Sequence, residues 1–383
     1  MTTDRRTIAL KSRTIAEQYA EKMILRSDPL RPLWNREAVL FNKPPRWNYI
    51  DSCMISAILR LMEINGDSRL LDYAIRFTDA YLETDGTIPT MEPLDYNLDN
   101  IAGGRNLVAL WRMTGEERYK LAFTKLYTGQ LVRQPRLVCG NYWHKAIYPH
   151  QIWLDGAYMA LPFLLEYGLL TNDTGIVRDV NVQLGNIRSL MCDTETGLYY
   201  HGYDESRSQA WADKTTGLSQ EFWLRSIGWL CAGLADIAEL EPDRISCCDM
   251  LSELLSAVGG CNRDGMLYQL PARPELKGNY PETSGTLLCA YAALKSARLG
   301  IADTAGTGFE LLGNVTERFI NDEGEIPVLS NICLMGGLGG DQQRDGSADY
   351  YLSESLVEND AKGIAPYIMA AAEAFVLTAN DEN

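Results

Sequence analysis

Residues 58–75 read ILRLMEINGDSRLLDYAI and predict two helices joined by a tight turn. Apolar residues recur every three or four positions on both sides of Asn65-Gly66-Asp67, which is the spacing of an amphipathic helix. Gly and Asn readily adopt the left-handed conformation that ends a helix, and an acidic residue favours the start of the next helix. The stretch therefore indicates a helical hairpin.

The same kind of turn recurs along the chain. The related turns are Thr114-Gly115-Glu116, Thr171-Asn172-Asp173, Glu241-Pro242-Asp243 and Gly300-Ile301-Ala302-Asp303. They lie roughly 50 to 70 residues apart, which is typical of a helical-hairpin repeat.

Hydrophobic periodicity predicts twelve helical segments, near residues 7–25, 47–64, 68–83, 98–113, 116–132, 152–169, 174–191, 221–239, 243–257, 282–299, 303–320 and 361–378. The first pair is joined across the long stretch 26–47 and not by a tight turn. Six hairpins that close on themselves give an all-α (α/α)6 toroid, and an open solenoid of six hairpins is the alternative. Minor strands are expected near 197–203 and 265–271. No linker or low-complexity stretch divides the chain, so we expect residues 1–383 to form one catalytic domain.

Composition narrows the range of partners. The formal net charge of −16 argues against nucleic acid and anionic membrane surfaces, because both require a basic footprint. The N-terminus has no signal-peptide pattern, and no stretch approaches the roughly 18 apolar residues of a membrane span. Nine cysteines without a CxxC motif indicate reduced thiols, so we expect a cytoplasmic protein. The sequence does not indicate the oligomeric state.

Long connections lead from each outer helix into the next inner helix and should emerge together on one rim. These connections are 84–97, 133–151, 192–220, 258–281 and 321–360, and long loops are usually functional. Polar and aromatic residues gather where the inner helices begin, so we expect them to converge on this mouth. They are Tyr49, Asp99, Asp155, Trp223, Arg225, Glu282, Ser284 and Lys362.

Asp155 is the candidate proton donor. It stands in the apolar run Trp153-Leu154-Asp155-Gly156-Ala157-Tyr158-Met159, where a carboxyl group is costly unless it is bound or working. We expect Asp99 to be a second carboxylate beside it. For either residue, a plain helix N-cap is the structural alternative.

Several other residues are candidate substrate contacts. His144 and His201 lie in mouth loops, where we expect them to form hydrogen bonds. Trp223 and Trp229 could serve as apolar platforms for sugar rings or as core, and helical geometry implies that one of them is packing. The candidates for an anion clamp are Arg225, Lys145, Arg344 and Lys362, with solvated surface as the alternative for each. Three histidines without HExxH, and no P-loop, GxGxxG pattern with its acidic residue or GxSxG, predict neither a metal site nor a cofactor.

At these residues the chain resembles the unsaturated rhamnogalacturonyl hydrolases, glycoside hydrolase family 105, and more distantly the unsaturated glucuronyl hydrolases of family 88. The matching runs, in chain order, are Asp99-Asn100-Ile101 with Gly104, Trp143-His144-Lys145, Tyr148-Pro149, Trp153 to Met159, Gly197-Leu198-Tyr199-Tyr200-His201-Gly202, Trp211-Ala212-Asp213, Trp223-Leu224-Arg225, Gly228-Trp229, Asn279-Tyr280 with Glu282 and Ser284, Arg344-Asp345-Gly346-Ser347, Tyr350-Tyr351, and Asn359-Asp360 with Lys362.

The resemblance implies an (α/α)6 barrel without a metal, in which Asp155 is the general acid and Asp99 the second active-site aspartate. It places His201, Trp223, Arg225 and Trp229 around an unsaturated uronate and makes His144 and Tyr49 further pocket contacts. The implied activity releases a 4-deoxy-4,5-unsaturated uronic acid from the non-reducing end of a small anionic oligosaccharide made by a lyase, by hydration of the C4=C5 enol ether, with rhamnose as the expected leaving sugar. Three alternatives are a conventional inverting glycosidase, a sugar epimerase or isomerase, and a non-catalytic sugar-binding toroid.

Overall fold

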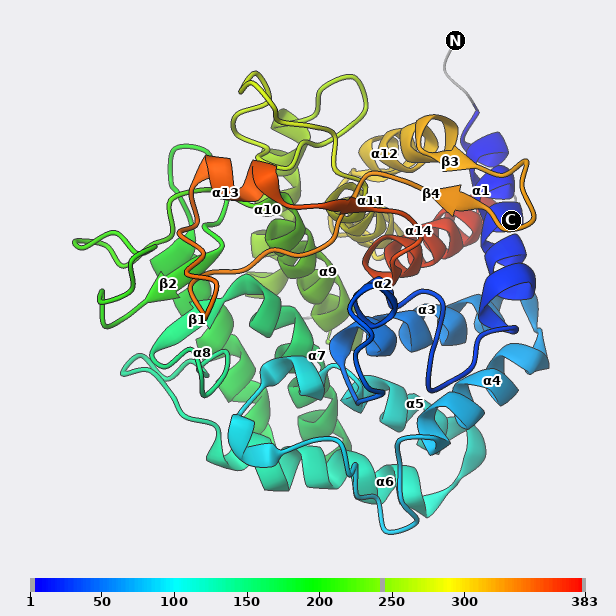
Figure 1. Ribbon diagram of the computed structural model, residues 1–383, viewed down its shortest axis with the longest axis horizontal. Coiled ribbons are helices and arrows are strands. Elements are labelled where there is room, and N and C mark those ends of the chain that lie inside the picture. Colours follow the sequence, from blue (N-terminus) through cyan, green and yellow to red (C-terminus); the bar gives the residue numbers. More distant parts are fainter. Residues whose placement is uncertain (1–3, 242–244, 381–383) are drawn as a thin grey trace.

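A closed ring of six inner helices forms the centre of the molecule. The computed structural model describes residues 4–241 and 245–380. The inner helices are α3 (Tyr49–Asn65), α5 (Gly104–Thr114), α7 (Leu154–Thr171), α9 (Leu224–Leu240), α11 (Thr283–Arg298) and α14 (Ala361–Asn380). Each packs against the next around the ring, and α14 also packs against α3. This closure confirms the predicted toroid and excludes the open solenoid (Figure 1).

The outer layer consists of α1 (Arg5–Tyr19), α4 (Ser68–Asp79), α6 (Glu117–Lys125), α8 (Thr174–Met191), α10 (Ile245–Gly260) and α12 (Ala305–Arg318). From α4 onward, each outer helix packs against the inner helix that precedes it in the chain. The expectation that the first segment pairs with the second is wrong, because α1 packs against α14 and α12. The two ends of the chain therefore form the sixth helix pair, as the neighbouring blue and red ribbons in Figure 1 show.

The tight turns have the predicted chemistry. Gly66, Gly115, Asn172 and Gly300 all adopt positive φ angles of 54° to 73°, the left-handed conformation that ends a helix. Asp67 and Asp173 then cap α4 and α8, because their carboxylates accept backbone N–H groups of the first helical turn. The predicted turn Glu241-Pro242-Asp243 lies partly outside the described residues.

Strands are minor, as expected. β1 (Gln151–Trp153) pairs antiparallel with β2 (Gly202–Asp204), β3 (Ile320–Asn321) with β4 (Val328–Leu329), and β5 (Ile332–Cys333) with β6 (Leu356–Val357). The expected strand near 197–203 contributes β2, but its partner is the segment before α7. The stretch 265–271 forms only isolated bridges. Two short helices, α2 (Arg36–Leu40) and α13 (Ala348–Ser353), lie in the long connections. Among the described residues, no helix is long and apolar enough to cross a bilayer.

A buried ion cluster ties three inner helices together. The carboxylate of Asp236 in α9 accepts hydrogen bonds from Arg105 in α5 at 2.6 Å and from Lys295 in α11 at 2.7 Å. Tyr291 donates a third bond at 2.5 Å. Burial acts to raise the pKa of Asp236, but the two cations outweigh it and hold the pKa well below its usual range.

We predict that Asp236→Asn lowers the free energy of unfolding by about 3 kcal/mol or more, because it leaves buried cations without their shared carboxylate. Urea unfolding at neutral pH measures the change. Glu63→Gln is the matched control, since the exposed pair between Glu63 and Arg60 should contribute less than about 1 kcal/mol. Equal losses in the two variants would contradict a structural role for the cluster.

Candidate active site

The predicted residues lie where the inner helices begin. Tyr49 is the first residue of α3, and Asp155, Arg225 and Lys362 are each the second residue of α7, α9 and α14. Asp99 lies in the 3-10 turn Leu98–Ile101, just before α5. Because the inner helices that carry these residues run in the same direction around the ring, their starting ends share one mouth.

Asp155 contacts His201. The β1–β2 ladder pairs Trp153 with Gly202, and the backbone N–H of Leu154 donates to the carbonyl of His201 at 3.2 Å. This pairing brings His201 Nε2 within 3.1 Å of Asp155 Oδ2. The Asp155 side chain is 16% exposed, whereas the His201 ring is fully buried. The carboxyl group can therefore reach a bound molecule while its partner is screened from water.

A tyrosine completes this chain of hydrogen bonds. His201 Nδ1 lies 2.7 Å from the hydroxyl of Tyr351, which is fully buried in α13. Burial raises the pKa of Tyr351 well above its usual value, so the hydroxyl keeps its proton. If Tyr351 donates to Nδ1, the Nε2–H group donates to an Asp155 carboxylate. If Asp155 is protonated, it can donate to Nε2 while Nδ1–H donates to Tyr351. The chain is thus compatible with both charge states of Asp155.

Asp99 belongs to a neighbouring pair. Lys145 Nζ donates to Asp99 Oδ2 at 2.5 Å, and His144 Nε2 lies 3.9 Å from Asp99 Oδ1. Asp99 is 14% exposed. Lys145 thus neutralises a carboxylate and leaves little free positive charge for a separate anion.

His144 joins the two pairs. Its ring stacks on Trp153 at a centroid distance of 4.5 Å, and Trp153 in turn meets the His201 ring edge-on at 5.4 Å. Burial, followed by the charge of Lys145, lowers the pKa of His144 well below its usual value, so the ring is neutral. Its Nδ1 atom is buried and has no hydrogen-bond partner within the described residues.

Both tryptophans are buried, and each belongs to a different apolar cluster. Trp229 lies in the main core, where it stacks on Tyr158 at 4.7 Å and meets the edge of Tyr49 at 6.5 Å. Trp223 lies 4.7 Å from the His201 ring and carries the Arg225 guanidinium over its face at 4.6 Å.

Arg225 is buried and held in place. Its Nη1 donates to the Ser284 hydroxyl at 3.3 Å and to the carbonyl of Cys333. Glu282 fixes both of these partners, because its carboxylate accepts hydrogen bonds from Ser284 and from the backbone of Cys333. The guanidinium is a positive charge built into the wall of the mouth.

The other two candidate cations have protein partners. Lys362 Nζ is 1% exposed and lies 3.0 Å from Glu37 and 3.2 Å from Asp360. Arg344 donates to the Tyr148 hydroxyl at 2.9 Å and to the carbonyl of Gly339 at 3.0 Å. In this geometry Lys362 and Arg344 hold neighbouring loops.

Sequence reasoning did not select Tyr351, Trp153 or Glu37, although all three contact candidate residues. Tyr351 and Trp153 both lie within the motif runs that carry the family resemblance, and this position could have identified them as site residues. Glu37 lies in the 26–47 stretch, for which the sequence predicts no helix. Among the described residues, no group of three or more His, Cys, Asp or Glu side chains could hold a metal ion.

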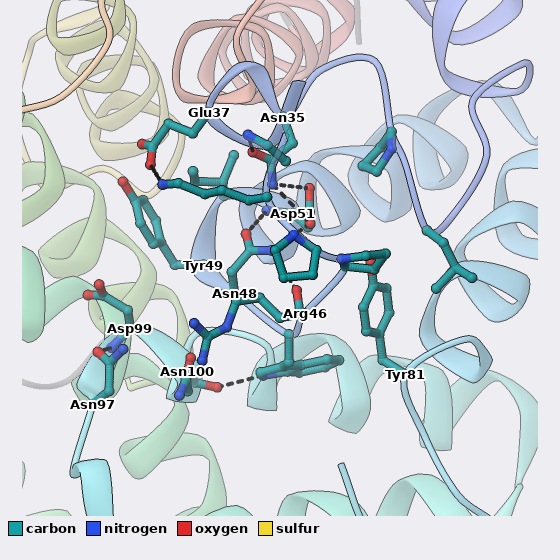
Figure 2. A pocket seen from close by; sticks show the side chains of 18 of the residues that line it. Asn35, Glu37, Arg46, Asn48, Tyr49, Asp51, Tyr81, Asn97, Asp99 and Asn100 are labelled. Atoms are coloured by element: carbon teal, nitrogen blue, oxygen red, sulfur yellow. Dashed lines mark hydrogen bonds and ion pairs between the residues drawn. The ribbon is translucent and has the colours of Figure 1, made fainter. Parts of the chain in front are cut away.

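A cavity of about 350 Å³ adjoins the Asp99 side of the mouth. Its lining includes Tyr49 and Asp99, together with residues of the 30–51 stretch. Figure 2 shows Tyr49 and Asp99 on one side of this cavity, with Asn35 and Asp51 on another. Neither Asp155 nor His201 is among its lining residues.

The all-helical toroid thus carries a partly exposed carboxyl–imidazole pair at its mouth. A family model described as Glycosyl Hydrolase Family 88 matches residues 16–378. A solved glycoside hydrolase of family 105 from C. acetobutylicum has a TM-score of 0.85 and 32% identity, covering 94% of this chain and 99% of that one. The chain therefore belongs to glycosyl hydrolase family 88 and groups with the family 105 enzymes.

Other relatives agree with this assignment. Protein Atu3128 of Agrobacterium fabrum is 38% identical over 232 residues, which are 57% of this chain and 99% of that protein. The unsaturated rhamnogalacturonyl hydrolase YesR of Bacillus subtilis is 23% identical over 263 residues, 66% of this chain and 72% of its own length. The unsaturated glucuronyl hydrolase of Bacillus sp. GL1 shares the fold with a TM-score of 0.67 and 15% identity, covering 96% of both chains. The protein is thus an enzyme of the unsaturated uronyl hydrolase type.

We predict that Tyr351→Phe lowers kcat and shifts the pH profile of turnover, because His201 Nδ1 loses the hydroxyl that can either donate to it or accept from it as Asp155 changes its charge state. Steady-state kinetics from pH 4 to pH 9 would measure both effects. Tyr350→Phe is the matched control, since the Tyr350 hydroxyl accepts a bond from Gly337. If the pH profile of Tyr351→Phe were unchanged, the chain of hydrogen bonds from Tyr351 through His201 to Asp155 would have no role in turnover.

Proposed function

We propose that the protein removes the 4-deoxy-4,5-unsaturated uronic acid residue at the non-reducing end of oligosaccharides made by a polysaccharide lyase, by hydrating the C4=C5 bond of that residue. The observation that carries this proposal is the Asp155 carboxyl group, partly exposed and hydrogen-bonded to His201. Family membership and the likeness to YesR support the same reaction class. We propose unsaturated galacturonyl-rhamnose as the substrate, with rhamnose as the leaving sugar.

The reaction begins at the C4=C5 bond, which is an enol ether in such a uronic acid. Asp155 donates its proton to C4, and the ring oxygen stabilises the positive charge that develops at C5. Water attacks C5 and gives up a proton to the Asp155 carboxylate, which restores the acid. The resulting hemiketal opens to a ketone at C5, which leaves C1 as a hemiacetal. This hemiacetal collapses to an aldehyde and releases the leaving sugar as an alcohol. A single carboxyl group thus serves as acid and then as base.

The neighbouring groups have supporting roles. His201 stabilises the carboxylate formed after the first step, since its Nε2–H can donate to Asp155. Asp99 and His201 assist in orienting the water. Arg225 supplies positive charge for the uronate, and Trp223, Trp229, Tyr49 and His144 form the surrounding pocket. Lys145 keeps Asp99 in place, while Lys362 and Arg344 position the loops.

We further propose that residues 1–383 act as one catalytic domain without a cofactor, and that the enzyme works in the cytoplasm. The continuous packing from α1 to α14 supports the first point. All nine cysteines are free thiols, which suits a reducing compartment.

We predict that Asp155→Asn lowers turnover by about 10²-fold to 10⁴-fold or more, because the amide cannot donate the proton, while the thermal unfolding temperature stays near that of the wild type. Loss of the enol-ether absorbance measures turnover. The substrates are lyase digests of rhamnogalacturonan, polygalacturonate and hyaluronan, and the first should react fastest. Asp193→Asn is a control, since this aspartate stabilises a turn after α8. An active Asp155→Asn variant would overturn the assignment.

A further inference from the structure

The cavity beside Asp99 shares lining residues with the mouth, although Asp155 is not one of them. Tyr49 and Asp99 contribute to its lining and also belong to the group of mouth residues. Its volume of about 350 Å³ lies at the lower end of the range for small-molecule sites, about 300–1,000 Å³. A molecule whose reacting end lies at Asp155 could therefore extend past Asp99 into this cavity.

The far wall of the cavity is a stretch that we call the strap, residues 26–47. The strap is fixed at several points. Trp34 Nε1 donates to the buried Asp51 carboxylate at 2.9 Å, and Trp47 Nε1 donates to the carbonyl of Asn100 at 2.8 Å. Lys362 holds the strap through Glu37 at 3.0 Å. A wall anchored in this way keeps the cavity open without a ligand, which lowers the entropic cost of binding.

The lining suits a sugar ring. Trp47 and Tyr81 contribute aromatic surface, and Pro44 and Pro45 add apolar surface. Such faces pack against the C–H faces of sugars. Polar groups lie between these faces, so a sugar could be held through both its C–H groups and its hydroxyls.

Most polar groups in the wall are already engaged with one another. The Asp51 carboxylate accepts bonds from Trp34, Asn35 and Asn48, and the Glu37 carboxylate lies between Lys362 and Lys43. These groups are satisfied and would need to lose partners in order to bind a ligand.

Two donors in the wall are free. Within residues 4–241 and 245–380, the Arg46 guanidinium and the Asn100 side-chain amide form no hydrogen bond or ion pair. Figure 2 shows the Arg46 side chain extending toward Asn97, Asp99 and Asn100. The exposed Asp95 at the rim lies beyond ion-pair distance of Arg46. Arg46 therefore presents an unneutralised positive charge next to the active centre.

We propose that this cavity binds the leaving side of the substrate and that Arg46 is a specificity-determining residue, which favours leaving groups that carry a carboxylate or a sulfate. Asn100 would assist by bonding a sugar hydroxyl. A planar guanidinium suits both anions, because each presents paired oxygen atoms. The proposal rests on the proposed function, since it assumes that the unsaturated uronate lies at Asp155.

Arg46→Gln tests the proposal on four substrates. The unsaturated uronyl-rhamnose disaccharide has a neutral leaving sugar, and the corresponding tetrasaccharide adds a carboxylate on its next uronate. Unsaturated chondroitin disaccharides with and without a sulfate on the amino sugar form the second arm. Arg178→Gln is the matched control, because Arg178 is an exposed arginine on the outer helix α8.

We expect Arg46→Gln to lower kcat/KM by about 10-fold or more on the carboxylate-bearing or the sulfated substrate, mainly through KM. Turnover of the neutral counterparts should change by less than about 2-fold, as should every rate of Arg178→Gln. A loss in one arm supports the proposal and identifies the anion.

Equal losses on charged and neutral substrates, or no loss on any, would overturn the subsite while leaving the proposed function intact. If the wild-type enzyme consumes the double bond of none of the four substrates, the proposed function itself fails and the subsite falls with it.

Discussion

The packing of α14 between α11 and α3 is the contact on which the rest of the architecture depends. It joins the last helix of the chain to the first inner helix and so converts a row of hairpins into a ring. The helix α1 covers α14 from outside, so both ends of the chain are committed to the closure. A closed ring brings the starts of all six inner helices to a common mouth. Residues more than 300 positions apart, such as Glu37 and Lys362, can then form an ion pair there.

The two aspartates of the mouth, Asp99 and Asp155, have different electrostatic surroundings. Asp99 is paired with a lysine, whereas Asp155 is paired with an imidazole that can accept or donate a proton. A lysine partner favours a permanent carboxylate, while a histidine partner linked to Tyr351 tolerates either charge state. This difference is the reason why we propose Asp155, and not Asp99, as the residue that transfers the proton.

Much of the fold could be predicted because helix periodicity, capping residues and turn residues act over only a few neighbouring positions. Gly66 and Asp67 specify a turn through backbone freedom and capping, and neither effect depends on distant residues. The positions of Tyr49, Asp155 and Arg225 at helix starts follow from the same periodicity. The partner of α1 could not be predicted in this way, because ring closure depends on the packing of both chain ends at once.

For the site, the sequence could identify candidate residues but not the distant residues that contact them. The sequence identifies Lys362 and Arg344 as cations near the mouth, but their partners Glu37 and Tyr148 come from distant segments. Tyr351 contacts His201 only because the 321–360 connection folds back over the mouth. Arg46 lies in the strap, which has no helical pattern or motif, so only the cavity in the folded protein distinguishes it from an ordinary surface arginine.

The most direct test of the central claim is whether a hydrogen from the solvent is incorporated at C4 of the released uronate. The enzyme would be run in D₂O on an unsaturated rhamnogalacturonan disaccharide, with quenching at early times and analysis of the released uronate by NMR. Proton donation from Asp155 to carbon predicts a single deuterium on one face of C4 and loss of the C4=C5 bond. A released uronate that retains the double bond and carries no deuterium at C4 would contradict the account.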